Sequence, residues 1–395
     1  MDKILSVNLG SSTLKWRLFE MPEELQIASG LVDFFDNSKA KITVKYGDQQ
    51  RERTFDKKLS LKDAIMILMD ELKRLKLVEH LHDIVGIGHR VVAGGEVFKA
   101  STVITETVLK QIDDLGIFAP LHNHVEVGGI ELFRQLMPWT TQVAVFDSAF
   151  HQTMSEENYL YGIPYEYYQK YGARKYGAHG TSVRYVSKRT AKLLNKPLSN
   201  LRLIVMHLGA GSSITAVKNG RSVDTSMGFS PLDGLIMNTR SGQIDASLVT
   251  YLMQKLNLKD PEEIIDILNN QSGLLGISGL SDDQRELKKL AETYPRAQLA
   301  LNMYANRVIK FVGSYLALMD GVDALVFTGG VGENSFEMRA QIMGSFGYVG
   351  ATIDSVKNKV MGKEIDISTS DAKIKTLVVP TNEELMIARD VYARL

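Results

Sequence analysis

Two hairpin-like segments rich in glycine and serine are the parts of this chain best suited to hold a phosphate. One apolar run reaches Leu9 and continues into Gly10-Ser11-Ser12-Thr13; another reaches Leu208 and continues into Gly209-Ala210-Gly211-Ser212. Small residues at a turn allow close approach and leave backbone N–H groups open for an anion. Neither segment has the Gly-Lys-Ser/Thr ending of a Walker loop or the glycine spacing of a dinucleotide fingerprint. The repetition predicts a duplicated fold that binds a polyphosphate.

Polar residues that could carry out phosphoryl transfer occur in several separate segments. They include two arginines, a histidine, carboxylates and an amide: Arg90, Arg240, His179, Asp147, Glu383 and Asn8. Arginine spreads fixed positive charge over phosphoryl oxygens, and oxygen donors suit Mg²⁺. Positioning and electrostatic stabilisation supply most of the catalysis in this type of reaction.

Structural roles are open for several of the same residues. Asp147 could be a turn residue at the end of a strand, and Glu383 could simply favour the start of a helix. The other histidines have structural interpretations: His80 and His82 fit an exposed surface, whereas His89, His151 and His207 border apolar runs and fit hydrogen bonding in the core. Arg240 lies between small residues with no acid nearby in sequence, so a structural role explains it less well.

Hydrophobic periodicity predicts an α/β protein with mixed sheets, because strand-like and helix-like segments alternate. Short buried strands at Ile84–Ile87 and Val143–Phe146 lead into Arg90 and Asp147. Open α/β sheets place their chemistry at such carboxyl ends. The other expected elements are a helix from Leu61 to Leu75, strands at Ala324–Phe327 and Leu377–Val379, a loop over Gly330–Asn334, and a last helix capped by Thr381 or Asn382.

Length and composition predict two domains and exclude several function classes. The chain has 395 residues, a formal net charge of +0 and no cysteine. A chain of this length exceeds one ordinary core, so we expect domains at 1–150 and 151–380, with the helix 381–395 completing the first. Zero net charge argues against nucleic-acid or membrane partners, and the missing cysteine excludes disulfides and thiolate sites. No signal peptide is expected. The apolar stretch Ala297–Met319 contains polar residues, so this stretch predicts a core helix and not a membrane span. Together these features predict a cytoplasmic protein.

Taken in order, the polar segments resemble those of the acetate kinase family, within the actin and sugar-kinase superfamily. The resemblance runs nearly end to end. The segments that carry it are Asn8–Lys15, Gly88-His89-Arg90-Val91-Val92, Ala119-Pro120-Leu121-His122-Asn123, Val145-Phe146-Asp147, His179-Gly180-Thr181-Ser182, His207-Leu208-Gly209, Asp224–Phe229, Thr239-Arg240-Ser241-Gly242, Phe327–Asn334 and Pro380–Glu384.

The resemblance implies a duplicated ribonuclease H-like fold, with two domains around a central cleft, that transfers phosphate between ATP and a short carboxylate. Asn8 and Glu383 would hold Mg²⁺, and Asp147, Arg90, Arg240, His179 and His122 would be catalytic. The acid would contact Arg90, Val92, Leu121, Ala178 and Pro231. The nucleotide would contact Ser11, Ser12, Lys15, His207, Gly209, Ala210, Gly211, Ser212, Asp283, Gln284, Arg285, Gly330, Val331, Gly332, Glu333 and Asn334. The family is typically cytoplasmic and homodimeric.

Departures from the family pattern leave the identity of the preferred carboxylic acid open. Ala178 stands where the family has an aromatic residue, Ala93 where it has a histidine, and His124-Val125-Glu126 where it has a proline-rich segment. Losing an aromatic ring at Ala178 and an imidazole at Ala93 would enlarge the acyl pocket and favour propionate or butyrate, unless neighbouring side chains refill the space and acetate stays preferred. Ala210 and Gln284 also depart from the family pattern and could loosen selectivity for the nucleotide. ATP is the expected phosphoryl donor. A non-catalytic nucleotide-binding protein is a further alternative.

Overall fold

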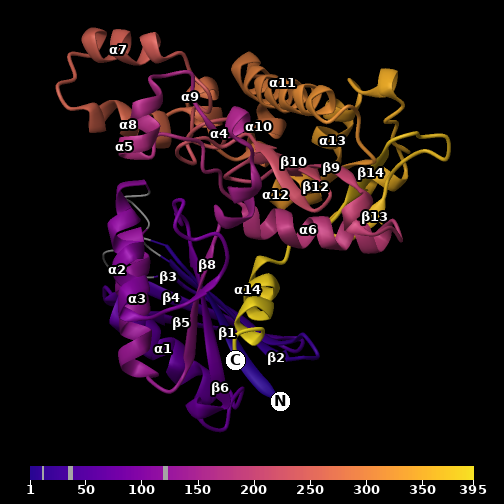
Figure 1. Ribbon diagram of the computed structural model, residues 1–395. Helices are drawn as coiled ribbons and strands as arrows, with labels where there is room; N and C mark the ends of the chain where they lie inside the picture. Colours follow the sequence, from indigo (N-terminus) through magenta and orange to yellow (C-terminus); the bar gives the residue numbers. More distant parts are fainter. Residues whose placement is uncertain (11–12, 34–38, 119–122) are drawn as a thin grey trace. The chain divides into compact units, whose positions relative to one another are not determined.

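The computed structural model describes residues 1–10, 13–33, 39–118 and 123–395. The chain divides into two compact units, one formed by Met1–Phe150 with Asn382–Leu395 and the other by His151–Thr381. Each unit has its own sheet and its own helices (Figure 1). Within the described ranges, no helix combines the length and the apolar character needed to cross a bilayer.

The first unit is built on an eight-stranded mixed sheet with the order β5-β4-β3-β2-β1-β6-β8-β7. Strand β1 is antiparallel to β2 and parallel to β6, and β6 is parallel to β8. The strands are β1 (Asp2–Leu9), β2 (Thr13–Met21), β3 (Leu25–Asp33), β4 (Ala40–Tyr46), β5 (Gln49–Phe55), β6 (Ile84–Val91), β7 (Thr102–Val103) and β8 (Thr141–Phe146). Parallel β1, β6 and β8 end at the same edge, which therefore collects the residues that follow them.

The described residues of the first unit form four helices of eight or more residues: α1 (Leu61–Arg74), α2 (Glu106–Asp114), α3 (Asn123–Leu136) and α14 (Glu383–Tyr392). Helix α1 begins with a capping box between Ser60 and Asp63 and buries its apolar face, as the periodicity predicts. The C-terminal helix α14 packs on β1 and β6 (Figure 1). It approaches so closely that a Cβ on Gly88 would lie 2.2 Å from Ile387, so only glycine fits there.

The second unit is built on a six-stranded mixed sheet with the order β11-β10-β9-β12-β14-β13. Strand β9 is antiparallel to β10 and parallel to β12, and β12 is parallel to β14. The strands are β9 (Arg202–His207), β10 (Ser213–Lys218), β11 (Arg221–Thr225), β12 (Ala324–Thr328), β13 (Ile365–Asp366) and β14 (Lys375–Val378). Both glycine-rich segments thus connect antiparallel neighbours, which confirms the two predicted hairpins.

Ten α-helices belong to the second unit, which is described throughout. They are α4 (Glu156–Tyr159), α5 (Tyr165–Tyr171), α6 (Gly180–Leu193), α7 (Ala246–Lys255), α8 (Pro261–Asn270), α9 (Gly273–Ser278), α10 (Gln284–Leu290), α11 (Pro295–Leu318), α12 (Gly329–Asn334) and α13 (Phe336–Met343). Among them, α4, α6, α11 and α12 contact the sheet. Helix α11 buries Tyr304, Val308 and Val312 in the main apolar cluster, which confirms a core helix. The predicted loop over Gly330–Asn334 is wrong, because this segment is the short helix α12.

Candidate functional site

The edge of the first sheet gathers Arg90, Asp147 and Asn8. Arg90, near the end of β6, donates from Nε and Nη2 to Asp147 Oδ2, at 3.0 and 2.6 Å. Its Nη1 donates to Asn8 Oδ1 at 3.3 Å. The Asp147 side chain is 1% exposed and that of Arg90 is 22% exposed. The buried carboxylate therefore orients a guanidinium that still reaches solvent, as a group that grips an anion must.

Two more carboxyl groups influence the same guanidinium. Burial works against the charge of Arg90, but Asp147 and Glu383 raise its pKa above the ordinary value. Burial and the negative charge of Asp147 together raise the pKa of Glu383 to about 7, against the opposing effect of Arg90. Burial also raises the pKa of Glu126, on α3, to about 8, although Arg90 and the N–H of Val92 lower it. Several acids thus share one region with a single arginine at its centre.

Oxygen donors at this edge fit Mg²⁺ better than a transition metal. Among the described residues, no group of three or more His, Cys, Asp or Glu side chains could by itself hold a metal ion. Magnesium is usually held by one or two carboxylates together with substrate phosphates and water. The amide oxygen of Asn8 and the carboxylate of Glu383 are of the right type, and a cation would offset the crowding of negative charge around Glu383.

The second unit places the Gly209–Ser212 turn against the start of α12. The N–H groups of Val331 and Gly332 both donate to the Leu208 carbonyl, at 2.8 and 3.1 Å. Gly209 N–H donates to Ser212 Oγ at 3.1 Å, and that hydroxyl is buried beside Tyr304. The expectation of open N–H groups is therefore wrong for Gly209, and also for Gly10, whose N–H donates to the Thr13 carbonyl.

Two histidines stack beside this turn. The rings of His179 and His207 have centroids 4.2 Å apart and planes inclined by 25°. His179, in the left-handed conformation with φ of 61°, places Nδ1 2.9 Å from Ser213 Oγ. His207 Nδ1 lies 2.8 Å from the buried Ser182 Oγ. Each ring thus has a hydroxyl partner that restrains its orientation.

Arg240 reaches the same place from the loop after β11. A Cβ on Gly211 would lie 3.4 Å from His179 Nε2 and 3.8 Å from Arg240 Nη1, so these side chains face one glycine. Arg240 Nη1 also donates to the Pro231 carbonyl at 3.3 Å. The second unit therefore combines a guanidinium, an imidazole pair and a glycine-rich turn.

Ala178 belongs to a small apolar cluster with Met227 and Met237, and all three are buried. The two methionine side chains pack at the position where the sequence predicts vacated aromatic volume. Methionine is unbranched and fills irregular gaps well. This packing agrees with the alternative in which neighbouring side chains refill the space and acetate stays preferred. His151 supports this wall, because its Nε2 donates to the Ala178 carbonyl at 2.9 Å.

The segment expected to flank adenosine lies on α10. Asp283 is the N-cap of this helix and forms an ion pair with the exposed Arg285, while Gln284 is half-buried between them. The preceding Asp282 accepts a hydrogen bond from Asn238, whose N–H donates to Ala210. This chain of contacts connects α10 to the glycine turn.

The structure brings most predicted site residues into two groups, one in each unit. The first contains Asn8, Arg90, Asp147 and Glu383, with Val92 bonded to Glu126 and Lys15 opposite Asn8 in the hairpin. The second contains His179, His207, Arg240, Pro231, Ala178, the turn Gly209–Ser212 and α12. Ser11, Ser12, Leu121 and His122 lie outside the described residues.

Sequence reasoning missed four residues at these sites. Glu126, Met227 and Ser182 touch predicted site residues without having been assigned any role, and Thr381, expected only as a possible helix cap, donates its N–H to Glu333. Of these residues, only Glu126 could have been found from the sequence, because it is an acid at a position where the helical pattern of α3 expects an apolar residue.

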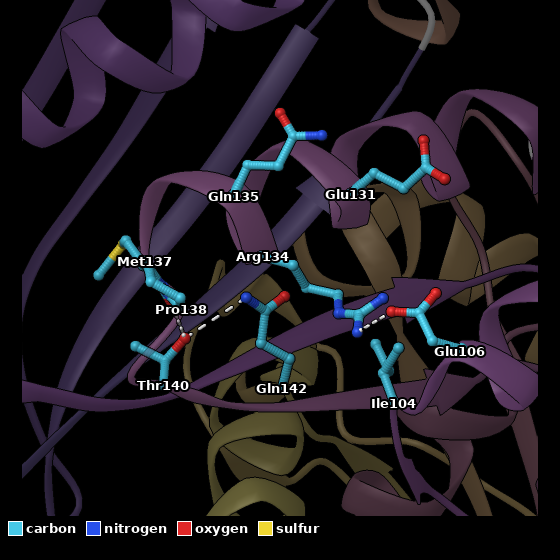
Figure 2. A pocket seen from close by; sticks show the side chains of 9 residues that line it. All are labelled: Ile104, Glu106, Glu131, Arg134, Gln135, Met137, Pro138, Thr140 and Gln142. Carbon is cyan, nitrogen blue, oxygen red and sulfur yellow. Dashed lines mark hydrogen bonds and ion pairs between the residues drawn. The ribbon is translucent and has the colours of Figure 1, made fainter.

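A surface hollow of about 560 Å³ in the first unit contains none of the predicted residues. Figure 2 shows its polar lining, with Arg134 paired to Glu106 and Gln142 bonded to Thr140. The arginine of this lining is already paired with an acid of the same wall, so the hollow gives no sign of an anionic ligand. Gln142 connects this hollow to the site, because it lies 2.8 Å from His89, the neighbour of Arg90.

The fold and the two groups of residues define an α/β protein equipped to bind several anions. Sequence comparison agrees: the chain belongs to the Acetokinase family, whose family profile matches residues 3–389. It is 60% identical over 394 residues to an acetate kinase of Lacticaseibacillus paracasei, covering 100% of each chain. Among solved structures, an acetate kinase of Porphyromonas gingivalis is 39% identical with a TM-score of 0.93, covering 100% of this chain and 99% of that one. A propionate kinase of Francisella tularensis is 42% identical, also with a TM-score of 0.93 and 100% coverage of both chains.

Proposed function

We propose that this protein catalyses the reversible, ATP-dependent phosphorylation of acetate to acetyl phosphate by direct in-line transfer. The observation that carries the proposal is the Arg90–Asp147–Asn8 cluster, found in a chain that belongs to the Acetokinase family over nearly its full length. Curated relatives at 49 to 60% identity are named acetate kinases, which supports acetate as the acid.

The chemistry follows from charge. A carboxylate is already ionised at neutral pH, so it attacks phosphorus without a general base. The obstacle is repulsion between this anion and the phosphoryl group, and fixed positive charge reduces it. In the proposal Arg90 and Arg240 supply that charge, and His179 donates a hydrogen bond to the transferring group. Asp147 holds Arg90 in place and does not abstract a proton.

Magnesium and nucleotide complete the proposed site. Asn8 and Glu383 would hold Mg²⁺, which when bound supplies positive charge to the phosphates. ATP would lie along the Gly209–Ser212 turn and α12, next to Asp283 and Arg285. The sequence also predicts contacts from Lys15 and from Ser11, Ser12, Leu121 and His122, which stay predictions.

Acetate is favoured over a larger acid by the packing around Ala178. Ala178, which replaces the aromatic residue, packs in a cluster with the buried Met227 and Met237, and these side chains occupy space beside it. Propionate or butyrate as the main substrate would need these methionines to move. We therefore propose acetate, with larger acids as poorer substrates.

The direct test is a hydroxamate assay for acyl phosphate with ATP, Mg²⁺ and a series of acids. Acetate is expected to give the highest kcat/KM, and omission of Mg²⁺ or ATP is expected to abolish the product. No acyl phosphate with any acid would refute the proposal and favour a nucleotide-binding protein without catalysis.

We also propose a cytoplasmic homodimer. Helix α7 buries none of its residues within the chain, and it exposes Leu248 and Tyr251. A second copy covering this apolar surface would account for it. Sedimentation equilibrium would measure the mass, and a monomer at micromolar concentration would contradict the dimer.

A further inference from the structure

Thr381 is the last residue of the second unit, immediately before Asn382 and Glu383 of the first. Its backbone N–H donates to Glu333 Oε1 at 3.1 Å. The same oxygen accepts the N–H of Gly329 at 2.9 Å. Glu333 was expected to touch nucleotide, but one of its oxygens holds the start of α12 and Thr381 together.

The hydroxyl of Thr381 begins a short series of hydrogen bonds. Thr381 Oγ1 lies 2.7 Å from Ser182 Oγ, in the first turn of α6. The Ser182 hydroxyl lies 2.8 Å from His207 Nδ1, and the His207 ring stacks on that of His179. Ser182 is fully buried, so water cannot easily take the place of Thr381 or His207, and breaking either hydrogen bond costs free energy.

We propose that Thr381 is a positioning residue that orients the His207 ring through Ser182 and, by ring contact, the His179 ring. This inference rests on the proposed function, because it assigns the two histidines to phosphoryl transfer. Thr381 touches no reacting group itself. It links the two histidines to α12 within the second unit.

The physical basis is that a serine hydroxyl has a single proton. If Ser182 donates to His207 Nδ1, then Thr381 must donate to Ser182, and the imidazole proton is on Nε2. In the opposite direction, His207 donates from Nδ1 and Ser182 donates to Thr381. In both directions the hydroxyls of Ser182 and Thr381 together fix the tautomer and the orientation of the His207 ring.

The experiment compares Thr381→Val with Thr381→Ser in the full-length protein. Valine keeps the shape and the backbone N–H but lacks Oγ1, whereas serine keeps Oγ. The kcat of acetyl phosphate formation is expected to fall roughly tenfold in Thr381→Val, with KM for acetate and ATP within about twofold. Thr381→Ser is expected to stay close to the unmodified protein. Nitrogen-15 NMR of the histidines is expected to show shifted His207 ring signals only in Thr381→Val.

Ser182→Ala provides a second variant, since alanine maintains α6 while removing the bridging hydroxyl. Its kcat and NMR changes are expected to match those of Thr381→Val, which also covers the case in which that variant folds poorly. The proposal is overturned if both variants keep normal kcat and normal His207 signals. An unmodified protein that forms no acyl phosphate would instead refute the proposed function, and the NMR comparison would still decide the positioning role.

Discussion

The two units place different side chains on sheets of the same topology. The strand order β3-β2-β1-β6-β8 in the first corresponds to β11-β10-β9-β12-β14 in the second, with matching parallel and antiparallel neighbours. A helix packs on each central pair: α14, from the end of the chain, packs on β1 and β6, and α6, which comes just before β9, packs on β9 and β12. The repeated hairpins in the sequence therefore reflect a repeated unit.

Equivalent edge positions carry different side chains. In the first unit Asn8 and Arg90 lie one residue past the paired Val7 and His89. In the second unit His207 pairs with Thr328, and glycines follow. One edge thus presents charge and carboxylates, whereas the other presents an imidazole, hydroxyls and backbone. Under the proposed function, the first unit supplies Arg90 and the oxygen ligands for Mg²⁺, whereas the second supplies Arg240, the histidines and the backbone along which ATP lies.

Arg90→Ala is expected to have the largest effect, because it removes the guanidinium that reaches solvent at the first edge and the ion pair of the buried Asp147 with it. We expect kcat/KM for acetate to fall by about 10³-fold. Arg90→Lys keeps the charge but not the two-nitrogen contact with Asp147, so it should recover little. Steady-state hydroxamate assays measure both.

Arg134→Ala is the matched control, since Arg134 pairs with Glu106 on the surface of the same unit. It should keep full activity. Asp147→Asn tests the orienting role, and it should lower kcat well below normal even at saturating Mg²⁺. Normal turnover in Arg90→Ala or in Asp147→Asn would remove the catalytic assignment of the first edge.

Glu126→Gln examines the cost of crowding acids around Arg90. The raised pKa of about 8 means that folded Glu126 keeps its proton between about pH 4.5 and 8, whereas the unfolded chain loses it. Folding stability therefore falls as pH rises through this window and levels off above it. Glutamine carries no proton that titrates, so Glu126→Gln does not lose stability in this way. The difference between its free energy of unfolding and that of the unmodified protein should therefore grow by a few kcal/mol from pH 5 to pH 8.

Urea unfolding of both proteins at several pH values measures this difference. Glu131→Gln, on the exposed side of the same helix, should follow the unmodified protein at every pH. Parallel stability curves for Glu126→Gln and the unmodified protein would mean that Glu126 is ionised in the fold.

The comparison also shows what the sequence could predict. Turn residues and apolar alternation predict both hairpins, and 3.6-residue spacing predicts α1 and α11, because these patterns depend on near neighbours. Asn382 was correctly expected as a possible cap of the last helix. The roles of Gly209 N–H and Glu333 could not be predicted, since their partners Ser212 Oγ and Thr381 N–H become partners only in the folded unit.

Gly330→Ala tests whether the second edge works through its backbone. A Cβ on Gly330 would meet no atom within 4 Å, so the free protein should fold normally. If ATP approaches the backbone there, the added methyl group should raise KM for ATP about tenfold and leave KM for acetate unchanged.

Gly329→Ala is the contrasting variant. Gly329 has φ of +76°, and a Cβ would lie 2.7 Å from the Leu208 carbonyl oxygen, so this change should lower the unfolding temperature as well. An unchanged KM for ATP in Gly330→Ala would place the nucleotide away from α12 and weaken the division of labour between the units.

The smallest effect is expected at the apolar wall of the second unit. Met227→Ala would open space beside Ala178, and a substrate methylene placed there contributes about 0.8 kcal/mol, or about fourfold in rate. The ratio of kcat/KM for propionate over acetate should therefore rise about fourfold. The exposed Met361→Ala should leave the ratio unchanged. Because the expected change is a ratio within one protein, losses in overall activity or stability cancel. A constant ratio would mean that Met227 does not border the acid, and specificity would then depend on Val92 in the first unit or on residues such as Leu121.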